Sequence, residues 1–148
     1  MIETQANKIV PITPPAAIID NASLVTAAID TAGFGYVDIY AWLGATDIAL
    51  TVLKVQESDA SDMTGAVDVT GLVFGATGAP ALPAATDDNK LYGFHVALGG
   101  SRKRYLDLVA TVGDGVAGGF VVAFAILSRA AEMPSTAAER GLAAELFV

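Results

Sequence analysis

The sequence contains no cysteine and a single histidine, His95. The absence of cysteine excludes disulfide bonds, thiolate metal sites and cysteine nucleophiles. A zinc site needs several nitrogen or sulfur ligands, so one histidine without cysteine argues strongly against it. Stability is therefore expected to come from packing and assembly.

Charged residues are also scarce, at 16% of the chain against about 25% in a typical domain, while 53% of the residues are apolar. The longest uninterrupted apolar run, Val116 to Leu127, is far shorter than the roughly 20 residues needed to cross a bilayer. The first residues also lack the basic and apolar regions of a secretion signal, which predicts synthesis in the cytoplasm. We expect the surplus apolar surface to be buried between subunits, because obligate interfaces resemble a domain core cut in half.

Basic residues are few. Eight lysines and arginines oppose sixteen acidic residues, which gives a net charge of −8. Such a chain repels nucleic acid and anionic membranes, so neither is expected as a partner.

Short β-branched or aromatic runs recur along the chain, each bounded by Gly, Asp, Asn or Pro. This pattern is typical of a β-sandwich or barrel. We predict an all-β, jelly-roll-like sandwich or barrel of about eight strands, at 18–19, 24–30, 36–43, 49–58, 67–74, 91–98, 104–112 and 119–128.

Two terminal segments flank the predicted strands. Residues 1–15 are polar and then rich in proline, which predicts an extended N-terminal arm ahead of a single domain at 16–148. We expect this arm to dock on a neighbour through Ile9, Val10, Pro11 and Ile12. Residues 134–141 read as one short helix, with Ser135 as N-cap and Gly141 as its stop. The apolar ending Leu146, Phe147 and Val148 should be covered by a partner.

The segment from Tyr36 alternates, with Val37, Ile39, Ala41 and Leu43 on one side of the predicted strand. The other side carries Tyr36, Asp38, Tyr40 and Trp42. Tyrosine and tryptophan are enriched at protein interfaces, which makes Tyr36, Tyr40 and Trp42 candidate contact residues. The alternative, that both sides of the strand are core, stays open.

The motifs that suggest chemistry have stronger structural explanations. Residues 113–118 match the spacing of a dinucleotide-binding loop, but strand-like residues follow where a helix is required, so we predict a Gly-rich hairpin. His95 lacks an accompanying nucleophile motif and is interpreted as structural. The acidic clusters at 57–62 and 87–89, with Asp107 and Asp114, could supply calcium ligands or paired carboxylates, although turn formation is favoured.

One basic cluster stands in this acidic chain, at residues 99–104. Arg102 and Lys103 are expected to meet acidic groups of a neighbouring subunit, or to form a solvated edge that blocks aberrant strand pairing.

Several stretches resemble a family of small virion proteins of tailed bacteriophages, the head decoration or cement proteins. The resemblance covers nearly the whole chain, at residues 14–23, 43–49, 54–59, 104–108 and the ending 140–148. It implies a jelly-roll-like fold that sits on the outer capsid surface at local three-fold points and holds capsomers together. It implies no catalytic residues and no cofactor.

The sequence therefore predicts a non-enzymatic capsid decoration protein without cofactor or metal, located on the virion. Its expected partners are the major capsid protein and itself, as a homotrimer. Two alternatives stay open: a jelly roll that binds a small ligand or carbohydrate, with lyase or hydrolase activity built on carboxylates, and a phage tail or receptor-binding component.

Overall fold

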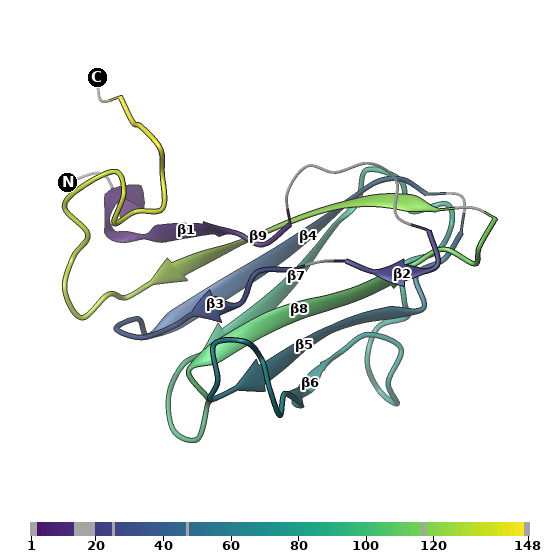
Figure 1. The fold of residues 1–148 in the computed structure, drawn as a ribbon, viewed down its shortest axis with the longest axis horizontal. Helices are drawn as coiled ribbons and strands as arrows, with labels where there is room; N and C mark the ends of the chain where they lie inside the picture. The colour runs from purple at the N-terminus through teal and green to yellow at the C-terminus, as the bar shows by residue number, and fades with distance from the viewer. Residues whose placement is uncertain (1–2, 14–19, 25, 47, 117, 147–148) are drawn as a thin grey trace.

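A computed structural model describes residues 3–13, 20–24, 26–46, 48–116 and 118–146 of the chain. Over these residues nine strands form two antiparallel sheets that pack face to face as a β-sandwich (Figure 1). A short 3-10 helix, η1 (Glu3–Ala6), precedes the first strand. None of the described helices is long and apolar enough to span a membrane. The prediction of an all-β sandwich is confirmed.

The first sheet, called sheet A, has four strands. Their order is β1 (Lys8–Pro11), β9 (Gly119–Ser128), β4 (Tyr36–Thr46) and β7 (Leu91–Ala97). The central pair of β4 and β9 keeps a continuous register from Tyr36 to Leu43 and then shifts before Thr46. Neighbours in this sheet are far apart in the sequence, so its outer face gathers residues from four distant segments.

The second sheet, called sheet B, has five strands. β2 (Ala22–Ser23) and β3 (Ile29–Asp30) both pair with the same side of β8 (Tyr105–Val112), which is followed by β5 (Val52–Ser58) and β6 (Val67–Val73). The connections β4–β5, β6–β7 and β8–β9 each cross from one sheet to the other.

The core lies between the sheets because every long strand alternates. Val37, Ile39 and Leu43 point inward from β4, and Leu106 and Leu108 do so from β8, all without solvent exposure. Fully burying such a side chain stabilises the fold by about 1.5–3 kcal/mol. The inward faces therefore account for the fold.

The structure corrects the expectation of a free N-terminal arm at residues 8–13. This segment is extended, but it forms strand β1 of sheet A, pairing Lys8 to Pro11 with β9. Ile12 is 2% exposed and belongs to the core, and Val10 packs against it. Pro11 is tolerated because β1 is an edge strand, where a missing N–H breaks no central ladder.

The predicted C-terminal helix is wrong, because residues 134–141 form a single turn. Its start and stop signals lie too close together. Thr136 and Glu139 make a capping box, in which each side chain accepts a hydrogen bond from the other's backbone N–H, at 3.2 and 3.0 Å. Gly141, at φ +77°, then ends the turn as predicted. Thr136, rather than Ser135, is the N-cap.

Other boundaries differ locally. Among the described residues of the predicted strand 24–30, only those of β3 form a strand, and no local pattern predicted β1 or β2. The predicted strand 18–19 lies outside the described residues. The six remaining predicted strands all appear, with ends within three residues of the expected ones.

Candidate interaction face

The outward side of sheet A is the candidate functional site, and we call it the outer face. The side chains that alternate with the core positions of β4 and β9 lie on it, and register places residues of β1 and β7 beside them. It is formed by Ile9, Pro11, Tyr36, Asp38, Tyr40, Trp42, Leu91, His95, Ala97, Phe120, Val122, Phe124 and Ile126.

Aromatic side chains occupy the middle of the outer face. Tyr40 pairs in register with Phe124 on one side and Gly93 on the other. Its ring lies 5.5 Å from that of Phe124 and meets the His95 ring edge-on at 6.1 Å. The rings of Tyr40 and His95 lie over Gly93, at 3.4 to 3.6 Å from where a Cβ would stand. Edge-on contacts of this kind are among the arrangements that aromatic side chains prefer.

The next row of the outer face is strongly exposed. Trp42 lies between Val122 of β9 and Leu91 of β7. The exposed fraction is 52% for Trp42 and 57% for Leu91. Phe120, Val122 and Ile9 are exposed as well. Contiguous exposed apolar patches of this kind typically mark binding surfaces.

One polar pair sits within this apolar surface. His95 Nδ1 lies 2.6 Å from Asp38 Oδ1, across the β4–β7 ladder. The pair resembles two members of a hydrolytic triad, but no serine hydroxyl bonds to His95 in the part of the chain that the structure describes. The pair therefore gives the outer face a polar contact point. Sequence reasoning missed it, because 57 residues separate the two side chains and only the strand register brings them together.

The predicted interface residues other than Arg102 and Lys103 divide into three groups. Ile9, Pro11, Tyr36, Tyr40 and Trp42 come together on the outer face. Val10 and Ile12 turn inward, which corrects their assignment, since neighbouring residues of a strand point to opposite sides. Leu146 is 98% exposed, while Phe147 and Val148 lie outside the described residues.

The basic cluster is balanced by acidic groups of the same chain. Arg102 lies 3.5 Å from Glu57, and Lys103 lies 3.8 Å from Asp59, near the end of β5 in sheet B. These contacts pair the charges internally and away from the outer face, so the structure lends no support to Arg102 and Lys103 as partner contacts.

The acidic clusters make turns. Asp62 accepts a hydrogen bond from the Thr64 N–H at 2.9 Å, which lowers the pKa of Asp62. Asp87 accepts hydrogen bonds from Lys90, the Ala84 N–H and the Tyr92 hydroxyl, which lower its pKa to about 2. Burial and this carboxylate raise the pKa of Tyr92 to about 12. The interpretation as turns is confirmed at both positions, and no group of three metal-ligating side chains occurs among the described residues.

The Gly-rich segment 113–118 leads from β8 in sheet B to β9 in sheet A, so the predicted hairpin is wrong. Gly113, at φ +94°, lies so close to the chain that an added Cβ would be 2.3 Å from the Asn21 nitrogen. The Gly115 N–H donates to Asp20 Oδ1 at 2.9 Å. A strand follows, as expected, and not the helix that a dinucleotide site requires.

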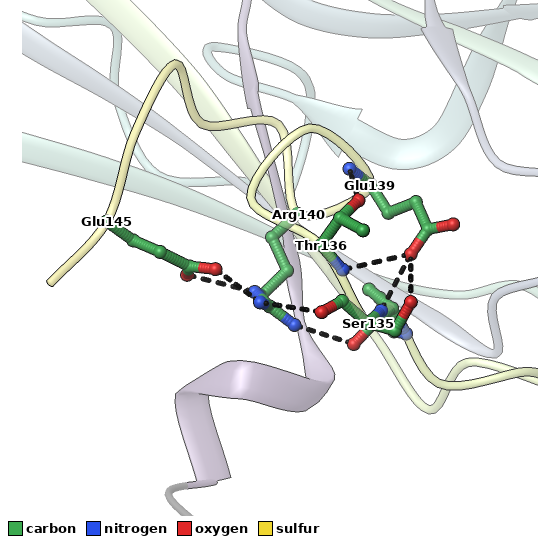
Figure 2. A network of polar contacts seen from close by, with 6 residues as sticks. Ser135, Thr136, Glu139, Arg140 and Glu145 are labelled. Atoms are coloured by element: carbon green, nitrogen blue, oxygen red, sulfur yellow. Dashed lines mark hydrogen bonds and ion pairs between the residues drawn. The ribbon is translucent and has the colours of Figure 1, made fainter. Parts of the chain in front are cut away.

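A second polar cluster closes one end of the sandwich, around the buried side chain of Arg140. Figure 2 shows its guanidinium group between Glu145 on one side and the Ser135 segment on the other. Arg140 forms an ion pair with Glu145 and donates to the carbonyl oxygens of Pro134 and Ser135, at 2.7 and 3.2 Å. The hydrogen bond from Arg140 lowers the pKa of Glu145. All three of its guanidinium nitrogens donate within the C-terminal segment, which indicates a structural clamp.

The clamp also holds β1. The Ile9 N–H donates to the Arg140 carbonyl oxygen at 2.8 Å, which brings the two terminal segments together at one end of the molecule (Figure 1). A Cβ on Gly141 would lie 1.8 Å from the Ile9 carbonyl oxygen, so only glycine permits this approach.

Comparison with known proteins adds no relative. No family model, no curated protein and no solved structure matches this chain. The geometry of the outer face is therefore the main guide to function.

Proposed function

We propose that the chain is a non-enzymatic structural protein, a decoration protein that binds the outer surface of a tailed-phage head and stabilises contacts between capsomers. The observation that carries this proposal is the outer face of sheet A. It is a rigid, aromatic-rich and largely apolar surface built on four paired strands. Protein interfaces are enriched in the same residue types at their centres.

The charge supports the same proposal. The chain carries a net charge of −8, whereas the outer face holds Asp38 beside His95 and no other charged group among its defining residues. An acidic protein is suited to the outside of a DNA container, where no nucleic acid has to be bound.

The major capsid protein is the proposed partner, and its binding can be measured directly. Heads of the phage that encodes this chain, stripped of the protein, should take up purified protein to saturation and become more resistant to heat. Failure to bind stripped heads, with the protein folded, would reject the decoration function.

A carbohydrate-binding function is the second candidate, favoured by the exposed Trp42 beside the Tyr40 ring. Aromatic platforms of this kind stack against sugar rings. Trp42 is the only tryptophan, so its fluorescence reports on this surface alone. A saturable change in its emission with oligosaccharides, together with no uptake by heads, would favour this candidate over decoration.

A further inference from the structure

The four edges of the sandwich differ in how they are protected. Unpaired edge strands invite pairing with another chain, and natural proteins blunt them with prolines, bulges or short strands. β1 contains Pro11, and its Ile9 N–H is already used by Arg140. β2 and β3 are two residues long each. β6 has a register shift against β5 and contains Gly71 at φ +87°.

β7 carries none of these devices. It pairs with β4 without interruption from Leu91 to Ala97 and contains neither proline nor a carboxylate. No described strand lies on its other side. β7 is therefore a regular, seven-residue open edge.

Hydrogen bonding fixes which backbone groups face this edge. The Leu98 N–H donates to Gly35 and the Leu43 N–H donates to the carbonyl oxygen of Lys90, so the even-numbered residues of β7 bond to β4. The N–H and C=O groups of the odd-numbered residues then point to the open side. These residues are all exposed, namely Leu91, Gly93, His95 and Ala97.

An apolar pocket lies between this edge and β6. It has a volume of about 160 Å³ and is lined by Gly71–Phe74, Ala79, Pro80, Gly93 and Phe94. Phe74 and Phe94 both line it, and their rings lie 5.2 Å apart and nearly perpendicular. A strand added beside β7 would direct alternate side chains toward this pocket.

We propose that the open edge of β7 binds an extended segment of another protein as an added strand, with one apolar side chain of that segment in the pocket between β6 and β7. The segment lacks acidic residues and has basic residues at its ends. This chemistry follows from the net charge of −8, which disfavours a second copy of the chain and favours a cationic peptide. Main-chain hydrogen bonds supply affinity in such complexes, and pockets supply specificity.

Gly93 offers a matched pair of variants. A Cβ at this position would lie 3.4 Å or more from its neighbours, so Gly93→Ala fits and keeps the N–H. Gly93→Pro removes an N–H that faces the open edge while the bonds to β4 remain. A peptide that adds as a strand should bind Gly93→Ala more tightly than Gly93→Pro. A ligand that binds the outer face should bind both variants equally.

A second pair of variants, Ala79→Leu and Ala81→Leu, tests the pocket. Ala79 lines it, so Ala79→Leu should fill the space that the partner's side chain needs. Ala81 is exposed and lies outside the pocket lining, which makes Ala81→Leu the matched control.

The probe is a synthetic capped peptide as long as β7, of alternating valine and threonine with a central leucine and a lysine at each end. Calorimetry on the full chain should detect binding, unchanged within about twofold in Gly93→Ala and Ala81→Leu and weakened about tenfold or more in Gly93→Pro and Ala79→Leu. A peptide N-methylated on alternate residues should fail to bind the unaltered protein, which keeps the test valid if Gly93→Pro does not fold.

Three results would overturn the proposal. They are no binding of the peptide, equal binding of the methylated peptide, and a dimer of the unaltered protein that Gly93→Pro converts to monomer. The last would identify the occupant as a second copy. Uptake by phage heads is a separate measurement, so this proposal and the decoration function can fail independently.

Discussion

The two sheets share one core, but the outer surface of sheet B is polar whereas that of sheet A is largely apolar. The outside of sheet B is linked by polar contacts, with Lys54 and Asp68 at 2.7 Å and Arg104 and Asp30 at 2.8 Å. The outside of sheet A holds Tyr40, Trp42 and their apolar neighbours, with the pair of Asp38 and His95 and the Arg129 guanidinium 4.9 Å from the centre of the Tyr36 ring. The inward residues of both sheets are buried in one core, so the difference concerns what each outer surface meets in solution. Much of the exposed apolar surface therefore lies on the outer face of sheet A.

Ile39 and Trp42 lie on the same strand, β4, but Ile39 points into the core and Trp42 points to the outer face. Ile39→Ala should destabilise the protein by about 2–5 kcal/mol, because it leaves a cavity between the sheets. Trp42→Ala should change the free energy of unfolding by less than about 1 kcal/mol, since half of its surface is already in water. Urea unfolding of the free proteins measures both. Equal losses would show that the outer face is part of the fold.

Gly141→Ala should disrupt the contact between the C-terminal segment and the edge strand β1. Its Cβ would collide with the Ile9 carbonyl and its φ is positive, so the expected loss is at least about 1–3 kcal/mol. Gly33, at φ +84°, has no atom within 4 Å of an added Cβ. Gly33→Ala therefore carries the backbone strain alone and should cost less by thermal unfolding. If the two variants melt together, the contact between the termini contributes nothing.

The smallest effect is expected on the outside of sheet B, at Asp107. Burial raises the pKa of Asp107, and its Oδ1 atom has no hydrogen-bond partner. A raised pKa in the folded state means that its contribution to stability is complete below about pH 3.8 and is lost as the pH rises through the raised value. Asp107→Asn should therefore stabilise the protein at pH 7, by up to about 1 kcal/mol because solvent screens part of this incompletely buried side chain. Unfolding at pH 3 and pH 7 should show the advantage shrinking in acid, and an advantage independent of pH would contradict the assignment.

Alternation made much of this architecture predictable. The period of two in residues 36–43 separated Ile39 from Trp42, and their burial follows that division. The resulting strands fixed the fold class, because short alternating segments bounded by turn residues have few other ways to bury one side. Capping signals likewise placed the turn that ends at Gly141.

The remaining features depend on contacts that no local pattern encodes. The pairing of β1 with β9 joins segments more than a hundred residues apart. Pro11 argued against a strand here, although proline is tolerated in an edge strand such as β1. The contact of His95 with Asp38 depends on the register of β4 and β7. The open edge of β7 depends on the strand order of the two sheets, which the sequence pattern does not predict. Only comparison with the other three edges shows that β7 alone lacks protection.

We propose that the outer face of sheet A docks on the phage head, and one pair of charge substitutions tests this proposal. Trp42→Glu adds a carboxylate in the middle of the outer face, whereas Thr70→Glu adds one at an exposed position of β6 in sheet B. Occupancy on stripped heads should be measured for both, normalised to the folded fraction. Trp42→Glu should lose at least about tenfold in affinity, whereas Thr70→Glu should bind like the unaltered protein. Equal binding by the two variants would show that the outer face is not the docking surface.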